Sequence, residues 1–146
     1  MFNPKLIITD LDGTALTDDK TILQSTIHAF AECKKAGIPI AIATARYIKS
    51  ALPYAKALGA DYMILTDGTL IFEKEKLIYS NTMTPETTSM IINELVQRNY
   101  ISHIAIPTEK NLYRFPYGEK GLTNSESQKQ DYTPGIKLDI HSPFPY

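Results

Sequence analysis

Leu6-Ile7-Ile8-Thr9-Asp10-Leu11-Asp12-Gly13-Thr14 is the stretch that decides the fold of this 146-residue chain. Its first three residues form a short apolar run of the kind that becomes a buried strand. Two carboxylates, Asp10 and Asp12, follow at the strand's end, in a turn that Gly13 allows to close. One such carboxylate can attack phosphorus while the other handles a proton, and both suit a hard cation such as Mg2+. The stretch therefore indicates phosphoryl chemistry; the alternative is an acidic turn without chemistry.

Helix and strand patterns alternate downstream of this stretch. A helix is expected over about residues 21–36, where Thr21 and Gln24 have the spacing of a capping box. The near-continuous apolar run at residues 38–43 suits a strand of a parallel sheet. A second helix should end at Gly59, with a late start or a kink at Pro53, and residues 62–66 should form a third strand.

This βαβαβ order predicts a parallel sheet with right-handed crossovers and helices on its faces. In such sheets the active site lies at the carboxyl ends of the strands. Asp10, Thr44 and Asp67 each come just after a predicted strand end. Asp67 has two open interpretations, a site residue and a plain turn-former.

The sequence changes character after about residue 80. Residues 70–72 and 77–79 flank a charged tetrapeptide and predict a hairpin. Thr84 and Pro85 should open a helix whose apolar face is made by Ile91, Ile92, Leu95 and Val96. Further strands are expected at residues 101–106, 112–115 and 136–140, with a polar loop at 118–130 and an irregular tail at 142–146.

The pentapeptide Asp10-Leu11-Asp12-Gly13-Thr14 after the first strand resembles the signature of the haloacid dehalogenase (HAD) superfamily. The resemblance implies that Asp10 is the nucleophile, which forms an aspartyl-phosphate, and that Asp12 is the general acid and base. It also implies that Asp10 and the main-chain carbonyl of Asp12 bind the cofactor Mg2+. Gly13 would let the phosphate-binding turn close.

Thr44 resembles the second motif of this superfamily, a Thr or Ser that holds the transferring phosphoryl group. A helix N-cap is the alternative interpretation of Thr44. The Cof-like subfamily, which has a large cap, usually shows Thr-Gly-Arg here, and this chain has Ala45 in place of the Gly. Arg46 has two open interpretations, a contact with an anion and a pair with a surface carboxylate.

The resemblance implies an α/β fold in two parts. Residues 1–80 would be the first half of a HAD-like Rossmannoid core, a partial parallel sheet of three strands with helices. Residues 81–146 would be part of an α+β cap. The family's third motif, a Lys, and its fourth, an acidic pair, follow the cap and find no match in this sequence.

Two functions stay open on this basis. The first is a Mg2+-dependent phosphatase of small phosphorylated metabolites. The second is a non-catalytic remnant of such an enzyme that binds metal or phosphate and self-associates. A homodimer is expected, because residues 6–9 would form an uncovered edge strand without the second half of the resembled fold.

Bulk composition excludes other partners and suggests a compartment. The net charge of -1 gives no basic surplus for contacts with nucleic acid. No apolar stretch approaches the roughly 20 residues of a membrane span. The single cysteine, Cys33, excludes an internal disulfide framework, and the N-terminus lacks a signal-peptide plan. Together these features predict a cytoplasmic protein.

Overall fold

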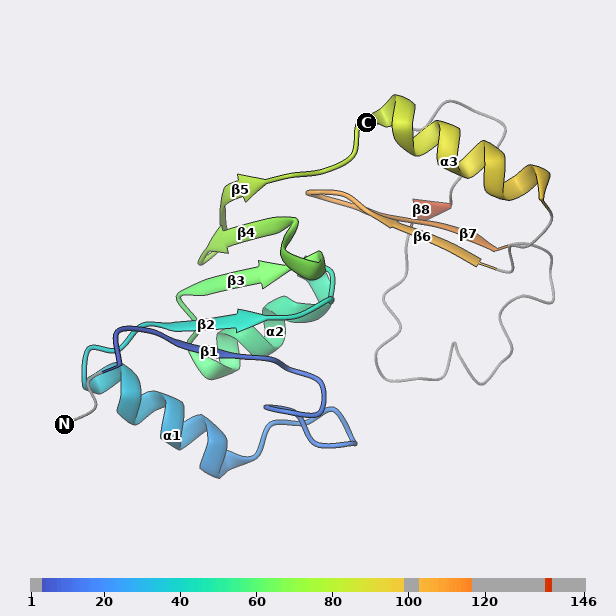
Figure 1. Ribbon diagram of the computed structural model, residues 1–146. Coiled ribbons are helices and arrows are strands. Elements are labelled where there is room, and N and C mark those ends of the chain that lie inside the picture. Colours follow the sequence, from blue (N-terminus) through green and yellow to red (C-terminus); the bar gives the residue numbers. More distant parts are fainter. Residues whose placement is uncertain (1–3, 99–102, 117–135, 138–146) are drawn as a thin grey trace. The chain divides into compact units, whose positions relative to one another are not determined.

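The computed structural model describes residues 4–98, 103–116 and 136–137 (Figure 1). The chain divides into two compact units, Met1–Asn81 and Thr82–Tyr146. The elements of the first unit are β1 (Ile7–Thr9), α1 (Gln24–Lys35), β2 (Ile40–Ala43), α2 (Ile48–Leu58), β3 (Tyr62–Leu65), the 3-10 turn η1 (Thr66–Gly68), β4 (Leu70–Glu73) and β5 (Lys76–Ser80).

The first unit is built on one five-stranded sheet with the order β1-β2-β3-β4-β5. The three strands β1, β2 and β3 run parallel, in a register that pairs Thr9 with Ile42 and Ile42 with Met63. The predicted hairpin is confirmed as β4 and β5, which extend the same sheet in antiparallel fashion. The α/β class and the three parallel core strands are therefore as expected.

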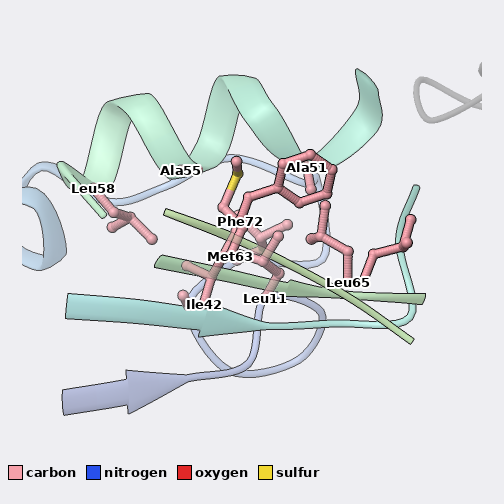
Figure 2. Packing of buried hydrophobic residues seen from close by; sticks show 11 residues of the cluster. Leu11, Ile42, Ala51, Ala55, Leu58, Met63, Leu65 and Phe72 are labelled. Atoms are coloured by element: carbon pink, nitrogen blue, oxygen red, sulfur yellow. The ribbon is translucent and has the colours of Figure 1, made fainter. Parts of the chain in front are cut away.

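One face of this sheet carries the core. The fully buried large side chains are Leu11, Ile40, Ile42, Met63, Leu65 and Leu70. Figure 2 shows α2 lying over the strands, with Ala51, Ala55 and Leu58 turned toward this cluster. Phe30 of α1 packs against the same cluster. Full burial of one such side chain is worth about 1.5–3 kcal/mol, so this cluster holds the strands and both helices together.

The opposite face of the sheet is only partly covered within the first unit. Leu6 and Ile8 lie on this side and are 42% and 54% exposed. Ile64 and Ile71, which are paired across β3 and β4, are half-buried there. A parallel sheet is normally covered on both faces. The first unit thus presents an apolar face that none of its described helices covers.

The helix α1 begins three residues later than predicted. Its N-cap is Leu23, which makes no side-chain capping bond. The prediction of a capping box formed by Thr21 and Gln24 is therefore wrong. Thr21 instead closes a turn: its carbonyl accepts from the Thr17 amide at 2.9 Å, and the two hydroxyls lie 2.9 Å apart. Since the Thr21 side chain is used in this turn, it is not available to cap the helix.

The helix α2 ends where predicted but does not start late. It begins at Ile48 and keeps Pro53 inside. Gly59 follows as a left-handed cap with φ 65°, and its amide donates to the Lys56 carbonyl at 3.1 Å. The expected delay at Pro53 is wrong, since the helix already has a full turn before the proline.

The second unit contains α3 (Pro85–Gln97) and a three-stranded sheet, with the order β6 (His103–Pro107), β7 (Leu112–Pro116) and β8 (Ile136–Lys137). The predicted N-cap of the helix α3 is confirmed, because Thr84 Oγ1 accepts a hydrogen bond from the Thr87 amide at 3.2 Å. Expectations for residues 101–102, 118–130, 138–140 and 142–146 lie outside the described residues.

The buried face of α3 differs from the predicted one. Ile92 is buried and packs with Val96 against the strands of this unit. Ile91 and Leu95 are each 39% exposed, so they do not belong to that face. Residues 88, 92 and 96, at a spacing of four, form the buried stripe instead.

Candidate active site

The predicted site residues follow the ends of the three parallel strands. Asp10 comes directly after β1, Thr44 directly after β2, and Asp67 lies in η1 directly after β3. Because parallel strands end at the same edge of a sheet, these positions lie along one edge, as expected from the sequence.

The loop that carries the two carboxylates is anchored by the residue between them. Leu11 is fully buried in the core, and its carbonyl accepts from the amides of Thr14 at 3.3 Å and Leu16 at 2.8 Å. The flanking Asp10 and Asp12 are both exposed. Burial of Leu11 therefore fixes the loop to the core and leaves both carboxylates facing solvent.

Gly13 is required for the conformation of this loop and not for space. Its φ is +76°, a left-handed value that side chains disfavour, and a Cβ at this position would meet no atom within 4 Å. Gly13 therefore allows the turn in which the Thr14 amide donates to the Leu11 carbonyl.

Asp12 is held by two cations. Arg46 Nε donates to Asp12 Oδ2 at 2.7 Å, and Arg46 Nη2 donates to Oδ1 at 2.8 Å, which is a bidentate pair. Lys20 Nζ donates to the same Oδ1 at 2.7 Å. Both oxygens of the Asp12 carboxylate are therefore engaged by positive groups.

This arrangement sets the ionisation of Asp12. The hydrogen bond from the Arg46 guanidinium holds the pKa of the Asp12 carboxyl well below its usual range; partial burial opposes this, and the Lys20 ammonium lowers the pKa further. Asp12 is therefore an ionised carboxylate and a weak base in this state. To take up a proton and then donate it, Asp12 must first be released by a cation.

Arg46 joins three loops of the site. Its side chain is only 12% exposed, and its guanidinium lies 5.0 Å from the centre of the Tyr54 ring on α2. Its amide donates to Thr44 Oγ1 at 3.2 Å, and its carbonyl accepts from the Thr66 amide at 3.3 Å. Of the two interpretations of Arg46, the structure supports a carboxylate pair, with Asp12 as its partner.

Thr44 is buried beneath this edge of the sheet. It is 9% exposed, and its amide donates to the Ile64 carbonyl at 2.9 Å. The interpretation of Thr44 as the N-cap of the second helix is wrong, because Tyr47 occupies that position. The Thr44 hydroxyl accepts from Arg46 and still has a proton to donate.

Asp67 lies in a strained turn. Thr66 and Asp67 both adopt left-handed backbone angles, with φ values of 48° and 56°. Such angles are uncommon for residues other than glycine, although Asp tolerates them better than most. The turn-forming interpretation of Asp67 is supported, and its exposed side chain lies beside the edge where the other site residues gather.

Comparison with known proteins identifies the family. The model of the haloacid dehalogenase-like hydrolase family matches residues 7–143. The chain belongs to this family. It is 29% identical over 126 residues to the pyridoxal phosphate phosphatase YbhA of Escherichia coli, covering 85% of this chain and 46% of that protein. It is 32% identical over 95 residues to a phosphoglycolate phosphatase of Methanopyrus kandleri, covering 65% and 38%.

A solved structure supports the same fold. The crystal structure of SMU.1108c from Streptococcus mutans matches 98% of this chain and 54% of that one, with a TM-score of 0.76 and 18% identity. This HAD-like chain thus spans about half the length of the proteins it matches. No helix in the described part of the chain is long and apolar enough to cross a membrane.

The oxygen groups of this HAD-like site fit Mg2+ in a limited way. The exposed Asp10 carboxylate and the Asp12 main-chain carbonyl are hard oxygen donors, whereas the Asp12 carboxylate is already occupied by cations. Among the described residues, no group of three or more His, Cys, Asp and Glu could hold a metal ion. Mg2+ commonly keeps several waters and uses one or two carboxylates, so the donors present suit a weakly held ion.

Two residues of this site do not follow from the sequence pattern. Lys20 contacts Asp12, and Tyr54 supports Arg46. Lys20 follows Asp18 and Asp19 in a polar loop, where a charged residue is usually solvated, so its position gave no signal. Tyr54 lies next to Pro53 on α2, and only the three-dimensional fold brings it to Arg46.

Proposed function

We propose that this chain carries the nucleophilic half-site of a Mg2+-dependent phosphatase that acts on small phosphorylated metabolites. The observation that carries the proposal is the pair Asp10 and Asp12, exposed at the carboxyl edge of a parallel sheet on a loop anchored by Leu11. The names of two relatives, a pyridoxal phosphate phosphatase and a phosphoglycolate phosphatase, support a small phosphorylated substrate.

The chemistry assigned to these residues proceeds in two steps. An oxygen of Asp10 attacks phosphorus, the bond from phosphorus to the leaving oxygen breaks, and Asp12 gives that oxygen a proton. In the second step Asp12 takes a proton from water, the water oxygen attacks phosphorus, and the bond to Asp10 breaks. Inorganic phosphate leaves, Asp10 is again a free carboxylate, and Asp12 again holds the proton that it gave in the first step.

Two further groups serve the phosphoryl group in this proposal. The Thr44 hydroxyl, which has a proton to donate, would hydrogen-bond a phosphoryl oxygen. Gly13 allows the backbone turn that lets a phosphoryl group approach Asp10. Bound by Asp10 and the Asp12 carbonyl, Mg2+ would neutralise negative charge between Asp10 and the phosphoryl oxygens.

Turnover by this chain alone should be slow. Hydrolysis of phosphate monoesters needs accelerations of up to about 10^21-fold, which depend on neutralising charge in the transition state. The sequence has no match to the Lys or to the acidic pair of the third and fourth family motifs. We therefore expect the phosphoenzyme to be easier to detect than turnover.

Intact-mass spectrometry after acid quenching tests the proposal. Incubation with acetyl phosphate and Mg2+ should add one phosphoryl group to the wild-type chain, and peptide mapping should locate it on Asp10. Asp10→Asn should remain unmodified, whereas Asp67→Asn, which alters an exposed acid beyond β3, should still be phosphorylated. A wild-type chain that stays unmodified and shows no turnover of p-nitrophenyl phosphate would refute the catalytic proposal.

The second candidate is a chain that binds phosphate or metal without catalysis. The observation that favours it is the set of hydrogen bonds from Arg46 and Lys20 to Asp12. These bonds stabilise the ionised carboxylate, which has no proton to donate. Binding of inorganic phosphate without any phosphorylation of Asp10 would select this alternative.

The remaining parts of the proposal concern organisation and setting. We assign residues 1–80 to the first half of the family's core and residues 81–146 to part of its cap. The apolar side chains of Leu6 and Ile8 on the partly covered face of β1 support a second copy of the chain as partner. A cytoplasmic setting fits the single unpaired cysteine, Cys33.

A further inference from the structure

The two cations on Asp12 are held in different ways. Arg46 grips both oxygens of Asp12 with its planar fork, is 12% exposed, and is backed by the Tyr54 ring. The Lys20 side chain is 36% exposed, and its ammonium donates to Oδ1, which Arg46 also contacts. Arg46 is therefore the fixed partner of Asp12, and Lys20 is the one that can move at lower cost.

The backbone presents Lys20 on a closed turn. The Lys20 amide donates to the Thr17 carbonyl at 2.9 Å, and the Thr17 amide donates to the Thr21 carbonyl at 2.9 Å. Lys20 itself has a left-handed φ of 58°. This turn fixes the backbone of Lys20 in the same loop as Asp10 and Asp12, and its flexible four-carbon stem allows the ammonium to change position.

Arg46 already balances the charge of Asp12, so Lys20 is a cation of the site that can contact an incoming anion. Arg46 and Asp12 alone form a neutral pair, and Asp12 does not need a second cation to balance its charge. A phosphoryl group approaching Asp10 brings further negative charge to the same edge. The Lys20 ammonium lies 2.7 Å from Asp12 Oδ1, on the same loop as Asp10, and can turn toward this added charge.

We propose that Lys20 is a phosphoryl-binding residue, whose ammonium moves from Asp12 Oδ1 to the phosphoryl oxygens when a phosphorylated ligand binds. This inference rests on the proposed function and deepens it. It gives the described half of the site a positive group of its own, whereas the family's third-motif Lys has no match in this sequence. The move also frees one side of Oδ1, which Asp12 needs for proton transfer.

Titration with inorganic phosphate in the presence of Mg2+, followed by 31P NMR and calorimetry, tests the inference. Lys20→Met should weaken phosphate binding about tenfold or more, as expected for the loss of a charge-assisted hydrogen bond. Lys20→Arg should keep most of the affinity, because it retains the charge. Lys56→Met is the matched control: Lys56 forms an exposed pair with Glu75, and its loss should leave phosphate binding unchanged. Equal affinities for wild type and Lys20→Met would overturn the inference.

A second comparison separates contact with phosphate from an effect through Asp12. In an Asp12→Ala background Lys20 has no carboxylate to orient. If Lys20 binds the phosphoryl group, Lys20→Met should still weaken phosphate binding in that background. If the effect disappears there, Lys20 acts only by positioning Asp12, and the inference fails.

The proposed function can fail independently of this inference. Phosphorylation of Asp10 by acetyl phosphate is read by mass, and phosphate affinity is read by titration. Loss of affinity in Lys20→Met together with an unmodified Asp10 would support the phosphate contact and reject catalysis. Phosphorylation of Asp10 together with unchanged phosphate affinity in Lys20→Met would support catalysis and reject the phosphate contact of Lys20.

Discussion

At the scale of single residues, two carboxylates of the first unit, Asp12 and Asp61, have similar partners but lie in different places. Asp12 and Asp61 both accept hydrogen bonds from a lysine ammonium, and both have a lowered pKa. Asp12 lies at the carboxyl edge of the sheet, where the proposed chemistry would take place. Asp61 lies just before β3, where its contacts hold chain segments together. We therefore expect the first pair to act in the proposed site and the second to stabilise the fold.

Replacing Asp61 should make stability less dependent on pH. Its Oδ1 accepts from Lys34 Nζ at 2.9 Å and its Oδ2 from the Ile40 amide at 3.0 Å. Burial alone would raise the pKa of Asp61, but these hydrogen bonds outweigh it and lower the pKa below 3.8. A carboxyl with a lowered folded pKa stabilises the fold above its unfolded pKa, and this contribution is lost as the pH falls through the folded pKa.

Urea unfolding of Asp61→Asn at pH 7 should therefore show a loss of about 1.5 kcal/mol. The difference from the wild type should shrink as the pH falls below about 4, where Asp61 of the unfolded chain takes up its proton before Asp61 of the folded chain does. Asp18→Asn, which changes an exposed carboxylate in the loop before α1, is the control and should leave stability near the wild-type value. A difference that stays constant from pH 7 to pH 3 would contradict the assignment.

Mg2+ binding should depend on Asp10. Calorimetry is expected to detect weak binding to the wild-type chain, because Asp10 and one main-chain carbonyl are few donors for this ion. Asp10→Asn should abolish the signal, whereas Asp67→Asn should keep it. Unchanged binding in Asp10→Asn would place the ion elsewhere on the chain.

At the scale of elements, local patterns predicted most segments and failed where side chains had competing partners. The parallel strands, the hairpin and the end of α2 at Gly59 follow from apolar runs and turn residues. The start of α1 does not, because the Thr21 hydroxyl pairs with Thr17 and not with the helix. The face of α3 was misassigned because four apolar residues in its last turns fit more than one stripe, and packing on the strands selects Ile92 and Val96.

The candidate site was predictable to the same extent. The strand ends place Asp10 and Thr44, because sheet topology alone brings them to one edge. The hydrogen bonds from Arg46 and Lys20 to Asp12 were not predictable, since the Arg46 pair joins two loops and both pairs depend on side-chain conformations. A sequence shows which charges exist, whereas only the folded chain shows which of them meet.

The cap of α3 should contribute measurably to the stability of the second unit. Thr84 Oγ1 accepts from the Thr87 amide at 3.2 Å, and Pro85 supplies a fixed φ at the first helical position. Thr84→Ala should cost about 1 kcal/mol, and Thr84→Ser should retain most of the stability because it keeps the hydroxyl. Hydrogen exchange of the α3 amides reports this directly. Equal protection in wild type and Thr84→Ala would show that the cap is not needed.

At the scale of the whole molecule, the first unit has one covered face and one partly covered face. Both helices of the β1-to-β3 crossovers pack against the cluster that contains Ile42 and Met63. The other face carries Leu6 and Ile8 at the end of the sheet, and they are 42% and 54% exposed. Beyond β1 the described residues add no further strand, so its outer backbone groups have no sheet partner among them. Such an edge favours association with another surface.

A second copy that covers this face predicts a dimer that depends on β1. Ile8→Lys should weaken the dimer, because it places a charge on the apolar side chain with the greatest exposure in β1, and burial of one such side chain is worth about 1.5–3 kcal/mol. Ile78→Lys is the matched control: Ile78 is 49% exposed on β5, the strand at the opposite end of the same sheet. Light scattering coupled to size exclusion at micromolar concentration should show a dimer for the wild type and for Ile78→Lys, and a smaller species for Ile8→Lys. A wild-type monomer that unfolds cooperatively would refute self-association, and dissociation by Ile78→Lys alone would move the interface to β5.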